Sequence, residues 1–185
     1  MSIRLKSAIY GLSVLTDRLA IAANAIGTLV VLGLVLIVNF DVVARGVFNA
    51  PFAGAVEVVQ FSMVLIVFLQ LPDVARVNRL TRSDGTLVAI TKLKPGLGKA
   101  LRHVVDAISA ILMGLIAWAI WPEFLEMWHS QDYFGVPGVF TAPWWPIKLT
   151  IFFSAVMCTL IFALKVLTPA IRPELVRVPE HEDNA

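Results

Sequence analysis

One stretch of the chain constrains its fold more than any other. From Leu19 to Val38 the sequence reads LAIAANAIGTLVVLGLVLIV, without a charged side chain. As an α-helix rising 1.5 Å per residue it would be about 30 Å long, which is the thickness of the hydrocarbon core of a bilayer. This stretch predicts a membrane-spanning helix. Because 58% of the 185 residues are hydrophobic and only 15% are charged, the prediction extends to the chain as a whole.

The hydrophobic pattern predicts an all-α integral membrane protein with four transmembrane helices. The spans are expected at about residues 19–40, 53–72, 104–121 and 146–167. Pro72 and Pro122 are expected to end the second and third spans, because proline lacks the N–H that continues a helix. Lys148 and Lys165 lie near the two ends of the fourth span, where their amines can snorkel to the membrane surface.

The flanking segments complete a single domain over residues 1–170. Residues 1–18 carry apolar side chains at helical spacing and predict a separate amphipathic helix lying on the inner membrane surface. A cleavable signal peptide is the rival interpretation, but the apolar stretch is longer than the usual h-region. Residues 171–185 are polar and contain Pro173 and Pro179, so we expect a flexible cytoplasmic tail.

The distribution of charge predicts the orientation. The connection between the second and third spans carries Arg76, Arg79, Arg82, Lys92, Lys94, Lys99 and Arg102. Residues 122–145, between the third and fourth spans, hold Glu123, Glu126 and Asp132 but no Lys or Arg. By the positive-inside rule both termini and the 73–103 loop are cytoplasmic. The 5 tryptophans all cluster around the opposite ends of the third and fourth spans, as expected for an interfacial belt.

Ionisable groups near a membrane are candidates for function, and they gather where the first span leads into the second. Asp41 and Arg45 are four residues apart, so a continued helix would pair them. Glu57 and Gln60 share a face of the second span, and a carboxylate at this depth needs a cation, a donor or water. The two candidate partners of the Glu57 carboxylate are Arg45, which the turn at Pro51 could bring close, and a partner protein. We expect a structural role for Glu57 and not a proton relay.

The sequence offers little support for a catalytic or cofactor-binding function. The single Cys158 excludes an intramolecular disulfide, and the 3 histidines show no metal-ligand spacing. We therefore expect no enzyme activity, no cofactor and no metal site, and a net charge of +2 gives no indication of nucleic-acid binding. The aromatic and proline-rich segment 134–146 could pack on itself, lie in the membrane interface or receive a docking protein.

The stretch Asn39 to Gln60, NFDVVARGVFNAPFAGAVEVVQ, resembles the signature of the small membrane subunit of tripartite ATP-independent periplasmic (TRAP) transporters. In that family an Arg, an aromatic residue and a Pro-containing turn precede a Gly-x-x-Glu motif that opens the second span. The corresponding residues are Arg45, Phe48, Asn49, Pro51, Gly54 and Glu57. The resemblance extends to the four-span plan, the basic loop and the Pro-aromatic stretch from Ala142 to Pro146. The sequence departs from many family members in lacking a His in the segment RLTRSDGTLVAI after the second span.

The resemblance implies a subunit of a bacterial inner-membrane importer. A periplasmic binding protein would deliver an organic acid or related solute to a large membrane subunit, which moves it inward on a cation gradient. The small subunit would scaffold the large one within the lipid bilayer. The candidate structural or subunit-interface residues are Asp41, Arg45, Phe48, Pro51, Gly54, Glu57, Gln60, Trp144 and Trp145. The alternative function, the membrane anchor of an oxidoreductase, would require cofactor ligands that the chain does not offer.

Overall fold

The computed structural model describes residues 3–77, 95–138 and 140–167, which form four helices and one β-hairpin. In chain order the elements are α1 (Ile3–Phe48), α2 (Ala55–Arg76), α4 (Pro95–Ser130), β1 (Tyr133–Val136), β2 (Phe140–Pro143) and α5 (Trp145–Leu167). All 4 helices are long and apolar enough to cross a membrane, which confirms the predicted fold class. The predicted tail 171–185 lies outside the described residues.

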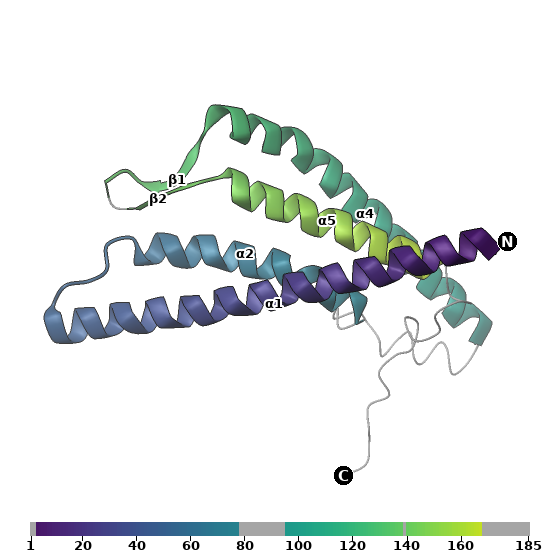
Figure 1. Ribbon diagram of the computed structural model, residues 1–185, viewed down its shortest axis with the longest axis horizontal. Helices are drawn as coiled ribbons and strands as arrows, with labels where there is room; N and C mark the ends of the chain where they lie inside the picture. The colour runs from purple at the N-terminus through teal and green to yellow at the C-terminus, as the bar shows by residue number, and fades with distance from the viewer. Residues whose placement is uncertain (1–2, 78–94, 139, 168–185) are drawn as a thin grey trace, which may run out of the picture.

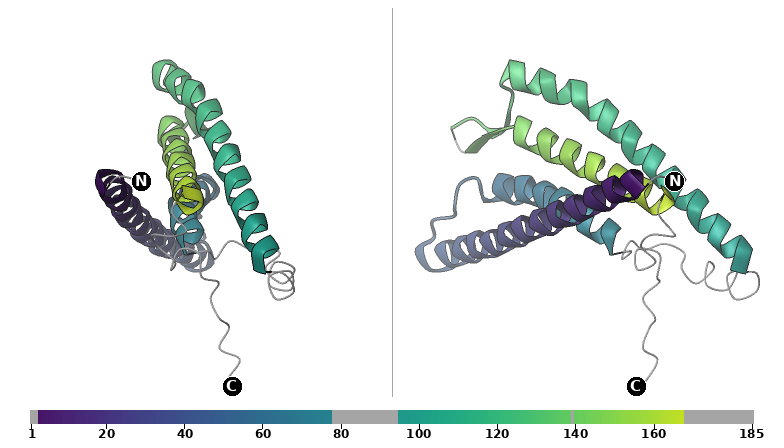
Figure 2. Two further views of the ribbon diagram at one scale, coloured as in Figure 1. Left: turned by 90° about the vertical axis from the view of Figure 1, so that its right-hand side faces the viewer. Right: turned by 45° about the vertical axis from the view of Figure 1, so that its right-hand side comes forward.

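The helices stand side by side in one row. α1 packs against α2, α2 against α5, and α5 against α4, with a smaller contact between α1 and α5, and α1 and α4 form the two flanks (Figures 1 and 2). Each consecutive pair, α1 with α2 and α4 with α5, is an antiparallel helical hairpin. Following the predicted orientation, we call the end where α1 begins and α2 and α5 finish the inner end. The opposite end, which carries the β-hairpin, is the outer end.

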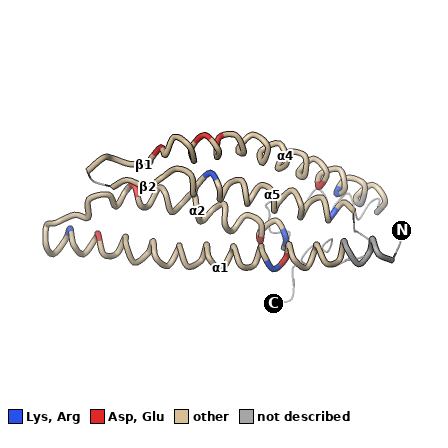
Figure 3. Tube along the Cα trace, turned by 45° about the horizontal axis from the view of Figure 1, so that its top comes forward, with Lys and Arg blue, Asp and Glu red and all other residues tan. Residues whose placement is uncertain are grey.

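Charged side chains lie toward the two ends of the row and leave its middle uncharged (Figure 3). The charges that bound this middle are Arg18 and Asp41 in α1, Glu57 and Asp73 in α2, Asp106 and Glu123 in α4, and Lys148 and Lys165 in α5. The enclosed segments are about 24 to 35 Å long at 1.5 Å per residue, close to the thickness of a bilayer core.

The core is formed where α1, α2 and α5 meet, in the inner half of the row. Its buried members are Ala20, Ala75, Met157, Cys158, Ile161 and Phe162. Small side chains on α1 allow this close approach, because a Cβ added at Gly27 would lie only 2.9 Å from Cγ of Gln70 on α2. The packing of small residues against a neighbouring helix is a common basis of helix association in membranes.

Two helices run past prolines that were expected to end them. α2 continues through Pro72 to Arg76, and α4 continues through Pro122 to Ser130, so both predicted ends are wrong. A proline removes one helical donor, but membrane helices tolerate this when neighbouring groups compensate. Pro72 is fully buried among the helices, where packing holds the helix in place.

The N-terminal segment is helical but is not a separate helix. α1 is one continuous helix of 46 residues, about 69 Å long, that includes both the amphipathic segment and the first span. No Gly or Pro occurs from Leu12 to Ile26 to interrupt it. The location of the first turns on the membrane surface stays a prediction.

The aromatic segment before α5 folds on itself as an antiparallel β-hairpin. Tyr133 pairs with Pro143 and Gly135 with Thr141. Gly135 has φ of 110°, and a Cβ there would lie 2.2 Å from the carbonyl oxygen of Phe140. Only glycine fits this position without distorting the hairpin.

Candidate functional site

Asp41 organises the turn between α1 and α2. One carboxylate oxygen accepts a bond from the Arg45 guanidinium at 2.9 Å, the pair that four-residue spacing predicts. The other oxygen accepts the backbone N–H of Phe52 at 2.8 Å, eleven residues further along the chain. The Asp41 side chain is only 13% exposed, whereas that of Arg45 is 63% exposed. Asp41 therefore ties the connecting turn to the last part of α1.

The turn itself is shaped by two residues with left-handed backbone. Asn49 follows the end of α1 with φ of 50°, and Gly54 precedes α2 with φ of 95°. The carbonyl of Gly54 accepts the N–H of Val58 at 3.0 Å and so begins the helical hydrogen bonding of α2. Glycine adopts this conformation without strain, which gives Gly54 of the family-like motif a physical role. Phe48 and Pro51 are exposed at this turn.

Glu57 lies in the first turn of α2, where the partial positive charge of the helix N-terminus favours a carboxylate. Arg45, one of the two candidate partners of Glu57, is instead paired with Asp41 on its own helix and makes no ion pair with Glu57. Within the described part of the chain, the half-buried Glu57 has no hydrogen bond or ion pair. Gln60 follows on the same helix and is exposed.

Trp144 and Trp145 belong to a chain of aromatic contacts that joins the hairpin to the helices. The ring of Trp144 meets Phe134 of β1 edge-on at 5.2 Å, and Phe134 lies 6.4 Å from Phe61 of α2. Trp145 meets Trp128 of α4 at 5.1 Å. These contacts connect both helical hairpins at the outer end. Lys148 of α5 and Glu123 of α4 add an ion pair on the same level of the row.

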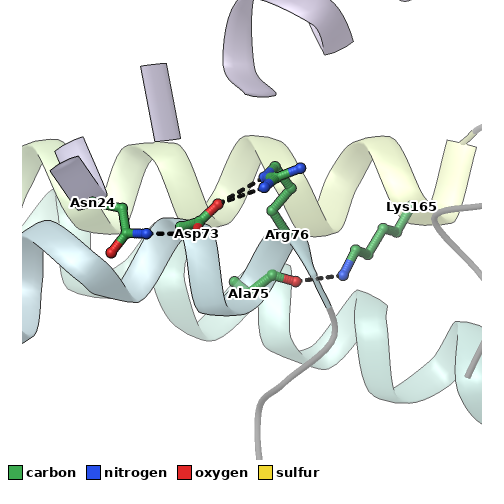
Figure 4. A network of polar contacts seen from close by, with 5 residues as sticks. All are labelled: Asn24, Asp73, Ala75, Arg76 and Lys165. Atoms are coloured by element: carbon green, nitrogen blue, oxygen red, sulfur yellow. Dashed lines mark hydrogen bonds and ion pairs between the residues drawn. The ribbon is translucent and has the colours of Figure 1, made fainter. Parts of the chain in front are cut away.

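The inner end holds a polar network that the sequence pattern did not predict (Figure 4). Asp73 of α2 accepts a bond from the Asn24 amide of α1 at 2.9 Å and is paired with Arg76 at 2.7 Å. Lys165 of α5 donates to the carbonyl oxygen of Ala75 at 2.5 Å. The network thus joins α1, α2 and α5 just beyond Pro72. Asn24, the one amide side chain in the uncharged run from Leu19 to Val38, is the signal that could have indicated it.

Lys165 does not snorkel as expected. Its side chain is only 4% exposed, and its amine lies 5.6 Å from the centre of the Phe162 ring as well as bonding to Ala75. A cation at this place interacts favourably with the carbonyl groups at the C-terminus of α2.

The candidate residues therefore form two separate groups. Asp41, Arg45 and Gly54 are brought together around the turn that precedes Glu57, while Trp144 and Trp145 belong to the aromatic contacts at the hairpin. His103 and His129 lie about 39 Å apart along α4 and cannot share a ligand. Among the described residues no three His, Cys, Asp or Glu side chains are grouped so that they could hold a metal ion.

More than half of the chain matches a known protein family. Residues 34–172 match the family described as "Tripartite ATP-independent periplasmic transporters, DctQ component". The match includes the outer part of α1, all of α2, α4 and α5, and every candidate site residue. No curated protein and no solved structure matches the chain.

Proposed function

Because the chain belongs to the DctQ family, the small component of TRAP transporters, we propose that it scaffolds a large membrane subunit. The complex takes up an organic acid or related solute, which a periplasmic binding protein delivers and a cation gradient drives inward. The chain resides in the bacterial inner membrane with both termini in the cytoplasm. Solute and cation are bound by the large subunit.

The packed contact between α2 and α5 is the observation that supports a scaffolding role. Where α2 and α5 meet, the space is filled by side chains such as Cys158 and Phe162, which are 0% and 1% exposed. Transporters that move a polar solute themselves line a path near the midplane with polar groups and interrupted helices. Here the middle of each helix is uncharged and continuous. This arrangement favours a structural subunit whose partner provides the path.

Uptake by reconstituted vesicles tests the proposal. Vesicles with this chain and the large subunit, supplied with the binding protein and a cation gradient, should accumulate solute in a saturable manner. Vesicles with the large subunit alone should lose most of this uptake, and vesicles with this chain alone should match empty ones. Saturable uptake by this chain alone would show that it transports by itself. Undiminished uptake by the large subunit in the absence of this chain would show that the scaffolding role is wrong.

A further inference from the structure

One side of α2 is open although the helix stands inside the row. α2 contacts α1 on one flank and α5 on the other. Between these contacts Val56, Gln60, Met63 and Val67 follow one another at intervals of three or four residues, so they lie on one helix face. We call these four residues the α2 stripe. Val56, Met63 and Val67 are 63%, 57% and 58% exposed.

Gln60 makes the stripe unsuitable for lipid. Two other exposed polar groups within the helices bond to their own backbone: the Thr28 hydroxyl donates to Asn24 at 2.9 Å, and the Asn39 amide donates to Val35 at 2.7 Å. Gln60 has no such bond to any described residue. It lies one turn further into the uncharged layer than Glu57, where an unsatisfied amide is costly.

Glu57 adds a requirement for positive charge beside the stripe. The two basic side chains at the outer ends of α1 and α5 are already engaged, Arg45 by Asp41 and Lys148 by Glu123. The half-buried carboxylate of Glu57 is therefore open to a basic group from another molecule.

The outward face of α4 provides the contrast. Its exposed residues at the corresponding spacing are Ile108, Ile111, Leu112 and Leu115, between 51% and 63% exposed. This face is apolar throughout and needs only lipid. The α2 stripe and this face of α4 therefore differ in hydrogen-bonding demand and not in exposure.

On the basis of the proposed function, we propose that the α2 stripe, together with Glu57, is the surface on which the large membrane subunit docks. A transmembrane helix of that subunit presents an amide or hydroxyl group to Gln60 and a Lys or Arg to Glu57. The apolar side chains of Val56, Met63 and Val67 pack against the same helix.

Site-specific photo-crosslinking in the intact complex tests this docking surface. A benzophenone amino acid replaces Met63 or Val67 in the stripe, and Leu112 or Leu115 on α4 as controls of matched exposure. Positions 63 and 67 should give an adduct of this chain with the co-expressed large subunit, and positions 112 and 115 should not.

Three outcomes would overturn the assignment while the large subunit still co-purifies. These are adducts with the large subunit from α4 and none from α2, adducts between two copies of this chain through positions 63 and 67, and no protein adduct at these positions. Failure of the unmodified chain to retain the large subunit would instead reject the proposed function itself.

Substitution of the amide gives an independent measurement. Gln60→Leu should lower the amount of large subunit recovered after detergent extraction by about threefold or more. The loss of one interhelical hydrogen bond in a membrane weakens binding by about this factor. Asn39→Leu removes an exposed amide whose bond stays within α1, so recovery should remain unchanged. Equal recovery of the large subunit with both variants would show that Gln60 does not take part in the contact.

Discussion

The two lysines of α5 occupy different environments, although each stands near an end of the same apolar helix. Lys148 pairs at the outer end with Glu123, whose side chain is 50% exposed. Lys165 is buried at the inner end and bonds to the backbone of α2. Exposed ion pairs contribute little to stability, whereas a buried charged donor on a carbonyl at a helix C-terminus contributes more.

Removal of the two charges should therefore have unequal effects. Lys165→Met keeps the length of the side chain but leaves the C-terminal carbonyl of α2 without its cation, so we expect a loss of about 1 to 3 kcal/mol in the free energy of unfolding. Lys148→Met should cost less than about 1 kcal/mol. Thermal unfolding in detergent, followed by tryptophan fluorescence, compares the two. A midpoint for Lys165→Met equal to that of the unmodified chain would show that the bond to Ala75 has no stabilising role.

Among the elements, the β-hairpin depends most on a single backbone conformation. Gly135 and Gly138 both have positive φ, 110° and 87°, but they differ in the space around them. A Cβ at Gly135 would strike the carbonyl of Phe140, whereas a Cβ at Gly138 would meet nothing within 4 Å. The two glycines thus separate steric exclusion from backbone strain.

Alanine is strained at both positions because of the positive φ, but only Gly135→Ala adds a steric clash, so Gly135→Ala should open the hairpin more than Gly138→Ala. The clash adds to the strain of the left-handed backbone, and each 1.4 kcal/mol of local destabilisation raises opening about tenfold. Limited chymotrypsin digestion at the outer face should therefore cleave the hairpin of Gly135→Ala at least about ten times faster than that of Gly138→Ala. Similar cleavage of both variants would mean that the contact with Phe140 does not maintain the hairpin.

The elements also show how far the sequence could predict the fold. Long apolar runs with few charges identified all four membrane helices, because the cost of burying charge in a bilayer acts locally along the chain. The helix end expected at Pro72 was wrong since the tolerance of that proline depends on neighbouring helices, and the burial of Lys165 depends on where α2 ends. The pairing of Asp41 with Arg45 was predictable from spacing within one helix. The network of Asn24 with Asp73 joins residues 49 apart, which no local pattern reveals.

At the scale of the whole molecule, the charges and aromatic rings make the two ends of the row chemically different. The outer end carries Glu123, Glu126 and Asp132 together with aromatic side chains, among them Trp128 and Trp145. Arg76 and Arg102 lie at the inner end, in helices that lead to and from the predicted basic loop. Basic segments are retained on the cytoplasmic side during insertion, and Trp prefers the interface. The asymmetry therefore predicts the direction in which the whole row is inserted.

Accessibility of single cysteines in intact cells measures that direction. Leu97, 57% exposed near the start of α4, reports on the inner end, and exposed Ser130 at its other end reports on the outer one. The buried Cys158 is first replaced by Ala, since it behaves as a small apolar side chain. Ser130→Cys should react with a membrane-impermeant maleimide in intact cells, whereas Leu97→Cys should react only after permeabilisation. Both cysteines report on one continuous helix, so they must give opposite results if α4 crosses the bilayer. If only Leu97→Cys is labelled in intact cells, the row is inserted in the opposite direction. The α2 turn with Asp41 and Glu57 would then lie in the cytoplasm, out of reach of any periplasmic binding protein.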